Sequence, residues 1–367
     1  MERKEFLKLC GILGIGLPAH FSLLSCTTDE NLLSDFKGKV LIIGAGAGGL
    51  SAAYLLSQRG VDFEILEASS VYGGRMRINT NFADFPIPLG SEWLETNPSV
   101  FQEIVNNPKV KIDIKTVVDS PDRKFVGSSW FNFFDEYILP SIKTKIKYKE
   151  IVQSIDYSGE KIKVYTKNGN YLADKVIISV PVKILQDKEV TFVPNLPKYK
   201  QDAIANIHIW EGFKAFFEFT ENFYGDGYEY AIRPETDGQK IYYNASFGQN
   251  TKKNILGLFA VGKPAREFLS FNNKDIKASI LNDLDKLFNK RATPSYVKHI
   301  SQNWNEEPFI KAGYISDYAD WRAVKAIGKS VAGKVYFAGG EYTDGEDWVS
   351  VHIAAQSAKV AVTELLK

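Results

Sequence analysis

The sequence predicts an α/β protein with a parallel sheet at its centre and a second part made mostly of β-sheet. Two observations carry this prediction. An apolar run near residue 40 leads into glycines spaced G-x-G-x-x-G and then into a helix-forming stretch. Close to the C-terminal end of the sequence, "VYFAGG" has the same order of strand and glycines, and an amphipathic segment follows it.

Composition limits the classes of function. The chain has 367 residues, 44% of them apolar and 24% charged, which is typical of a soluble globular protein with about two domains. The formal net charge is +1, so no basic surface for nucleic acid is expected. The four histidines lie far apart, and the two cysteines, Cys10 and Cys26, both precede the folded part. We therefore expect no metal site and no disulfide in the mature domain.

Residues 1–26 are predicted to be a signal segment rather than part of the fold. A basic start precedes a short apolar stretch that Pro18 and His20 interrupt, which makes a membrane-spanning helix a poor interpretation. The ending "LLSC" resembles a bacterial lipobox, and "RKEFLK" resembles a twin-arginine export signal in which Lys4 replaces the second arginine. These resemblances imply a periplasmic or cell-envelope lipoprotein, anchored to a membrane through lipidated Cys26. A plain secretory signal with a chance cysteine is the alternative.

A nucleotide cradle follows the polar linker 27–36. Val40–Ile43 reads as a buried parallel strand, and Gly44, Gly46 and Gly49 come directly after it. Gly44 permits a tight turn, Gly46 lets a pyrophosphate approach the backbone, and Gly49 allows close packing of helix on strand. The N-terminus of the helix that follows offers free N–H groups to the phosphates. The pattern predicts a Rossmann-type dinucleotide-binding domain.

The residues after the second strand indicate which dinucleotide binds. "DFEILEA" ends in Glu67, 23 residues after Gly44, where a carboxylate can hold ribose hydroxyls. That acid favours FAD or NAD over NADP, because the ribose of NADP carries a phosphate. The following "YGGRMR" places Gly74 and Arg75 where they can contact the pyrophosphate a second time. Nicotinamide enzymes do not need this second loop, so FAD is the predicted cofactor.

The segment "EAS…GGR", which includes Ala68, resembles the flavin-containing amine oxidase family of monoamine and polyamine oxidases. The resemblance implies the FAD-binding fold of the glutathione reductase superfamily (GR2-like), with an interleaved substrate domain. It gives these boundaries: an FAD-binding domain of 37–95, 142–196 and 310–367, and a substrate domain of 96–141 and 197–309. The stretch from Arg75 to Val152 is shorter than in most of the family, which implies a reduced lid.

The same resemblance implies further cofactor contacts. "LGSEWL" would pass beside the flavin ring, Val152 would contact the adenine through its backbone, and "FAGGEYT" would approach the ribityl or pyrophosphate part. The helix beginning near Val351 would point its N-terminus at the flavin, where its dipole stabilises negative charge. An N-cap or surface acid is the alternative for the glutamate of "GGEY". The residues so implied are Gly90, Ser91, Val152, Gly340, Glu341 and Val351.

Lys214 lies in "IWEGFKAFFEF", where alternation sets Phe213, Ala215, Phe217 and Phe219 on the face opposite the lysine. Alone, this pattern fits a solvated strand residue. The glycine two positions earlier and the later "NFYG" resemble the family's strand whose lysine binds a water that bridges to flavin N5. Tyr314, ten residues after Trp304, resembles one of the two aromatic rings that the family places around the amine, and Trp304 and Tyr314 are both expected to orient the substrate. The second aromatic position of the family appears as Ser350, or as Trp348 if the register slips.

The resemblance implies an oxidoreductase that transfers hydride from a small-molecule amine to non-covalent FAD. O2 or another carrier would accept the electrons, and with O2 the products would be an imine or aldehyde, ammonia or an amine, and H2O2. Two alternatives stay open: another flavin oxidoreductase of the superfamily, such as a desaturase or a protoporphyrinogen oxidase, and a non-catalytic FAD-binding lipoprotein. Lys214 and Tyr314 discriminate against the first alternative.

Overall fold

The computed structural model describes residues 33–117, 122–235 and 237–367, and residues 34–367 form one compact unit. The predicted signal segment 1–26 lies outside the described residues, as does most of the linker 27–36. Export and lipidation of Cys26 therefore stay predictions. Among the described residues, no helix combines the length and the apolar character that crossing a membrane requires.

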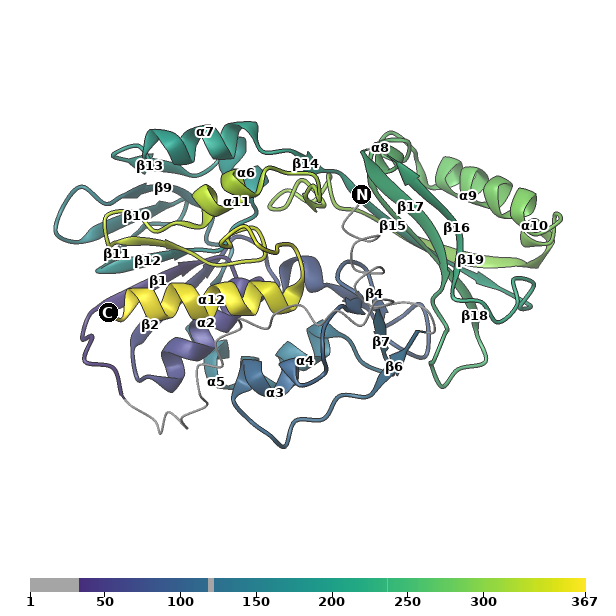
Figure 1. Cartoon of the computed structure of the whole chain (residues 1–367), viewed down its shortest axis with the longest axis horizontal. Helices are drawn as coiled ribbons and strands as arrows, with labels where there is room; N and C mark the ends of the chain where they lie inside the picture. Colours follow the sequence, from purple (N-terminus) through teal and green to yellow (C-terminus); the bar gives the residue numbers. More distant parts are fainter. Residues whose placement is uncertain (1–32, 118–121, 236) are drawn as a thin grey trace, which may run out of the picture. The chain divides into compact units, whose positions relative to one another are not determined.

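A five-stranded parallel sheet with the order β21-β12-β1-β2-β8 forms the centre of the nucleotide-binding part. The helices α2 (Ala47–Gln58) and α12 (Val351–Leu365) lie side by side near this sheet (Figure 1). Because helices and a second sheet cover both faces, the central strands are continuous apolar runs. The strands are β1 (Lys39–Ile43), β2 (Asp62–Glu67), β8 (Ile146–Tyr148), β12 (Lys175–Ile178) and β21 (Val335–Phe337).

A four-stranded sheet, β11-β10-β9-β13, and three helices share a hydrophobic core with the other face of the parallel sheet. Strands β9 to β11 are antiparallel, and β13 joins β9 in parallel. The elements are β9 (Val152–Asp156), β10 (Ile162–Thr166), β11 (Asn170–Ala173), β13 (Thr191–Val193), α6 (Val182–Gln186), α7 (Lys198–Asn206) and α11 (Trp321–Gly328).

Lys200 of α7 is fully buried and holds α7 against α11. Its Nζ donates to the Ile327 carbonyl (2.5 Å) and lies 3.7 Å from the centroid of the Phe337 ring. Burial lowers the pKa of Lys200 to about 7, and the nearby charge of Lys329 adds to the effect. The unfolded chain thus binds more protons than the folded chain between about pH 7 and 10, so stability rises with pH there.

We expect the free energy of unfolding to increase by roughly 2 kcal/mol between pH 7 and pH 9 because of Lys200 alone. Urea denaturation at several pH values measures this dependence, and Lys200→Met should remove it. Equal pH slopes in the wild type and the variant would show that Lys200 is not the responsible group.

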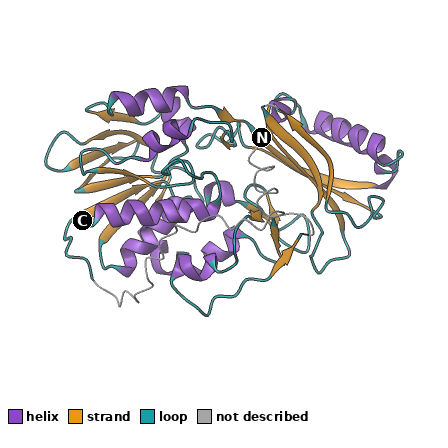
Figure 2. Cartoon of the chain, in the orientation of Figure 1, coloured by secondary structure: helices purple, strands orange, loops and turns teal. Residues whose placement is uncertain are grey.

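The second part of the fold is an antiparallel sheet, β16-β17-β18-β15-β19, with α9 along one face (Figure 2). Phe213, Phe217 and Phe219 pack with α9, and Lys214 and Phe216 lie on the opposite face, which confirms the predicted alternation. The elements are β14 (Ile209–Trp210), β15 (Gly212–Phe219), β16 (Glu229–Glu235), β17 (Gly238–Asn244), β18 (Asn254–Gly262), α8 (Lys263–Arg266), α9 (Asn273–Leu287), α10 (Ala292–Ser295), β19 (Tyr296–Asn303) and β20 (Tyr314–Ile315).

The segment 96–141, which the sequence analysis assigned to the substrate domain, packs against the nucleotide-binding part. Its apolar side chains, including Phe101, Trp130 and Phe133, share one core with α2 and the parallel sheet. The domain boundaries stay a prediction. The elements here are the 3-10 turn Gly74–Met76, β3 (Ile78–Asn79), β4 (Ile87–Pro88), β5 (Trp93–Leu94), α3 (Val100–Val105), β6 (Ile114–Thr116), β7 (Arg123–Phe125), α4 (Trp130–Tyr137), α5 (Leu139–Ile142) and the 3-10 turn Lys143–Lys145.

Candidate functional site

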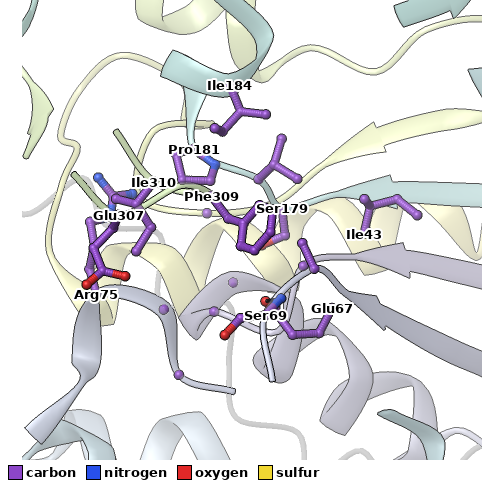
Figure 3. A pocket seen from close by; sticks show the side chains of 18 of the residues that line it. Ile43, Glu67, Ser69, Arg75, Ser179, Pro181, Ile184, Glu307, Phe309 and Ile310 are labelled. Atoms are coloured by element: carbon purple, nitrogen blue, oxygen red, sulfur yellow. Dashed lines mark hydrogen bonds between the residues drawn. The ribbon is translucent and has the colours of Figure 1, made fainter. Parts of the chain in front are cut away.

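A pocket of about 900 Å³ lies at the C-terminal ends of β1, β2 and β12. This volume is at the upper end of the range for small-molecule sites. Figure 3 shows Glu67 and Ser69 at one side of the pocket, Arg75 and Glu307 at the other, and Phe309 and Ser179 between them. Eleven of the predicted cofactor residues line it: Gly44, Gly46, Glu67, Ala68, Gly74, Arg75, Ser91, Val152, Gly340, Glu341 and Val351.

The glycines after β1 form the cradle in this pocket. Gly44 has φ +103°, and a Cβ there would lie 2.9 Å from the Ser179 carbonyl oxygen. A Cβ at Gly46 would meet nothing within 4 Å, so this position faces open space that a ligand can fill. Gly49 does not line the pocket. It supports the cradle, because a Cβ there would lie 2.0 Å from the Gly44 carbonyl oxygen.

The two predicted phosphate loops are joined directly. The Gly73 N–H donates to the Ala45 carbonyl (2.8 Å), and Gly74 lies against the Cα of Gly46. Glu67 closes the first loop, since its carboxylate accepts from the Ala45 N–H (2.6 Å) and the Ser69 N–H (2.8 Å). Each oxygen keeps a lone pair for a ribose hydroxyl. This arrangement fits a bound dinucleotide, because it offers open space, free N–H groups and an acid at the end of the second strand.

Arg75 and Glu341, which were each expected to contact the cofactor, form an ion pair with each other. Arg75 Nη1 donates to Glu341 Oε1 and to the Gly313 carbonyl, both at 2.5 Å. The other oxygen of Glu341 accepts from the Val182 N–H (2.7 Å). Glu341 is 3% exposed, so this pair links four segments of chain beside the pocket. The sequence analysis predicted that both residues contact the cofactor, but no pattern in the sequence indicated that they pair.

A second cavity of about 150 Å³ adjoins the first and shares five lining residues with it: Arg75, Ser91, Val349, Ser350 and Val351. The three predicted catalytic residues, Lys214, Trp304 and Tyr314, all line this second cavity, and so does Gly90. A Cβ at Gly90 would lie 1.9 Å from the Arg75 carbonyl oxygen, so the chain passes here without room for a side chain. Trp304 Nε1 donates to the Leu89 carbonyl (3.0 Å), which fixes the indole ring.

The start of α12 faces both cavities. Its first intrahelical bond runs from the Ala354 N–H to the Ser350 carbonyl, so the earlier N–H groups have no partner within the helix. Val349, directly before it, has φ +94°, which is an outlier for a β-branched residue. Its N–H donates to the Gly340 carbonyl (2.8 Å). Such strain gathers at ligand sites, where surrounding contacts hold it in place.

A further aromatic ring of the second cavity comes from a residue to which the sequence analysis gave no role. Trp348 packs on the core near α11, with Nε1 at 3.3 Å from the Ser316 carbonyl, and it does not line the cavity. Ser350 does line it, as the unshifted register predicts. Trp93, quoted within "LGSEWL" without a role, contributes the additional ring.

Glu95 is a functional candidate that sequence reasoning missed. Its side chain is exposed, lines the second cavity and accepts a hydrogen bond from the Ser350 hydroxyl. Desolvation by the surrounding protein raises the pKa of Glu95 to about 7, which the Ser350 hydrogen bond opposes. The nearby acids Asp122, Asp347 and Asp317 raise it further. The available signal was a carboxylate directly after the segment expected beside the flavin.

Lys214 is 2% exposed, and its ammonium has three protein acceptors. Nζ donates to Glu92 Oε2 (2.6 Å), to the Gly90 carbonyl (3.0 Å) and to the Pro88 carbonyl (3.3 Å). An ammonium has three N–H groups, so each already has a partner. The geometry shows this lysine bound to the 88–92 segment, and the bridging water that the resemblance implies on it stays a prediction.

The comparisons with known proteins agree with this geometry. A sequence profile described as "Flavin containing amine oxidoreductase" matches residues 132–366, and one described as "NAD(P)-binding Rossmann-like domain" matches residues 42–107. The first match covers more than half of the chain. The chain belongs to the flavin-containing amine oxidoreductase family. Its cofactor is FAD, and the described residues contain no cysteine that could bind a flavin covalently.

Among the relatives of this family member is mouse lysine-specific histone demethylase 1B, 25% identical over 201 residues. That alignment covers 53% of this chain and 24% of the demethylase, so the chain spans about a quarter of that protein. Maize polyamine oxidase 1 is 21% identical, with 90% of both chains covered. A structure of wild-type putrescine oxidase bound to putrescine has a TM-score of 0.72 at 13% identity, covering 90% of this chain and 99% of that one. This likeness shows the shared fold.

Among the residues of the described ranges, no group of three or more histidine, cysteine, aspartate or glutamate side chains could hold a metal ion.

Proposed function

We propose that this amine oxidase-like oxidoreductase oxidises an amine that carries a second positive charge, as a diamine or polyamine does. The observation that carries the proposal is the distribution of charge in the second cavity. Glu95 and the Lys214–Glu92 ion pair both line this cavity, together with Trp93, Trp304 and Tyr314. A cation there gains from the aromatic rings and from the carboxylate.

The charges of the cavity would orient such a substrate. The distal ammonium binds at Glu95 and Ser350, because the carboxylate attracts it and Lys214 repels it. The reacting amine is bound neutral at the other end, since an ammonium next to Lys214 is disfavoured. Trp304 and Tyr314 hold the carbon chain between them and exclude water.

Bound FAD would supply the acceptor for the hydride from the amine α-carbon, and O2 would take the electrons to give H2O2. Residues of the 900 Å³ pocket hold the dinucleotide, and the N-terminus of α12 favours negative charge where the two cavities meet. Hydrolysis of the imine would release an aldehyde. The names of the relatives, polyamine oxidase and putrescine oxidase, support a cationic substrate, and the comparisons do not favour the desaturase, protoporphyrinogen oxidase or non-catalytic alternatives.

We expect the FAD-loaded protein to form peroxide with α,ω-diamines or polyamines at lower concentrations than with monoamines of equal chain length. The reason is that only the former place a cation at Glu95. A coupled peroxidase assay over both amine series measures this. Equal activity on the two series would contradict the role of the second charge, and the absence of peroxide with every amine would contradict an oxidase.

A further inference from the structure

Behind Lys214 lies a buried cluster of charges that the predicted mechanism does not use. It consists of Glu92, Lys214, Lys124 of β7 and Tyr243 of β17, which are at most 3% exposed. Glu92 Oε2 accepts from Lys214 (2.6 Å) and from the Tyr243 hydroxyl (2.5 Å), and Glu92 Oε1 lies 3.3 Å from Lys124 Nζ. One carboxylate therefore stands between two ammonium groups.

Lys124 belongs to the side of the cluster that faces away from the substrate cavity. It does not line that cavity. It borders a separate hollow of about 10 Å³, room for about one water, which Glu92 and Gln249 also line. Its Nζ donates to the Ala245 carbonyl at 2.5 Å. Lys124 can thus act on the cavity only through Glu92 and through its charge.

The charges in this cluster do not cancel. Burial opposes ionisation of Glu92, yet the charges of Lys214 and Lys124 outweigh it, so the pKa of Glu92 lies below its usual value. Burial lowers the pKa of both Lys214 and Lys124, and the charge of Glu92 opposes this shift at each of them. With the carboxylate ionised and both lysines protonated, the cluster carries one net positive charge. An uncompensated buried cation is costly. Salt screens it poorly, so its field extends into the adjoining cavity.

We propose that Glu92 and Lys124 are positioning residues for Lys214. Glu92 fixes the Lys214 ammonium against the 88–92 segment, and Lys124 supplies the second positive charge that leaves the cavity wall net positive. This inference builds on the proposed function, because a positive wall keeps the reacting amine neutral and stabilises negative charge that develops on the cofactor. Two tyrosines lie near Lys124, Tyr228 and Tyr243, and they stay neutral because burial raises their pKa values. On the neighbouring strand β6, Lys115 is the cross-strand partner of Lys124.

The test is the midpoint potential of the flavin in the FAD-loaded full chain, titrated with a chemical reductant at constant pH. Lys124→Met removes one positive charge, so the equilibrium constant for two-electron reduction of the flavin should fall about tenfold or more. The midpoint potential should therefore fall by about 30 mV or more. Lys124→Arg should restore the potential. Glu92→Gln leaves two lysines without their anion and should raise it.

Lys240→Met is the matched control. Lys240 is a buried lysine, 4% exposed, in the antiparallel sheet that also contains Lys214. It is paired with Asp283 at 2.6 Å and does not line the cavity. Its loss should lower stability without moving the potential. Equal midpoint potentials in Lys124→Met and Lys240→Met would overturn the proposal. If Lys124→Met does not fold, a midpoint potential of Glu92→Gln at or below that of the wild type would overturn it. Because the titration uses no amine, its outcome is separate from that of the proposed activity.

Discussion

Replacing Gly46 with alanine should weaken FAD binding about tenfold or more while the apoprotein stays folded. A Cβ at this position meets no atom of the protein within 4 Å, and φ −82° with ψ −174° is open to any residue. The methyl group would occupy the space that the pyrophosphate needs, which removes at least one charge-assisted hydrogen bond. Titration of the apoprotein with FAD, followed by the flavin absorbance, measures the affinity.

Gly169→Ala is the control for this substitution. A Cβ at Gly169 also meets nothing within 4 Å, but this residue lies in the turn between β10 and β11, outside the pocket. The free energy of unfolding of both variants should lie within about 1 kcal/mol of the wild-type value, because neither substitution creates a clash. If Gly46→Ala bound FAD as the wild type does, the dinucleotide could not lie across the cradle of β1 and α2.

Glu95→Gln should lower kcat/KM for diamines roughly 10- to 100-fold and leave monoamines of equal length nearly unchanged. The glutamine keeps a hydrogen-bonding oxygen for Ser350 and loses only the charge. Steady-state kinetics with paired diamines and monoamines measures the difference. Since the loss should appear for one substrate series alone, a general loss of folding would be recognised at once.

The pH dependence sharpens this prediction. The pKa of Glu95 is raised to about 7, so the carboxylate is neutral below that pH and attracts no ammonium. For the wild type, kcat/KM with diamines should rise as pH increases through about 7, and Glu95→Gln should lack this rise. Glu103→Gln is the matched control, because Glu103 also bonds a serine hydroxyl, that of Ser99 (2.9 Å), and does not line the cavity. A persisting rise in Glu95→Gln would assign the titration to another group.

Local patterns predicted much of the nucleotide-binding part. The cradle from Gly44 to Gly49, the acid at Glu67 and the helix from Val351 depend on short-range geometry. Of these, Gly44, Gly46, Glu67 and Val351 line one pocket. In the stretch 143–149, lysines alternate with other residues, a pattern that favours a strand throughout. The stretch begins as a 3-10 turn, and only Ile146–Tyr148 pairs with the last residues of β2.

The missed features all depend on pairs of residues far apart in the sequence. Glu92 and Lys214, Ser350 and Glu95, and Arg75 and Glu341 are each separated by more than 100 positions. Alternation correctly turned Lys214 away from the α9 face, but no periodicity could show that a carboxylate would face it. The packing of 96–141 depends on tertiary contacts in the same way, because its aromatic residues share a core with α2.

Anaerobic mixing of the FAD-loaded protein with an α,ω-diamine tests the central claim most directly, because it isolates electron transfer from amine to flavin without any acceptor. The claim predicts that the oxidised flavin band bleaches with the diamine, and that a monoamine of the same length requires a higher concentration. A band that no amine bleaches, in protein whose flavin a chemical reductant does bleach, would contradict it.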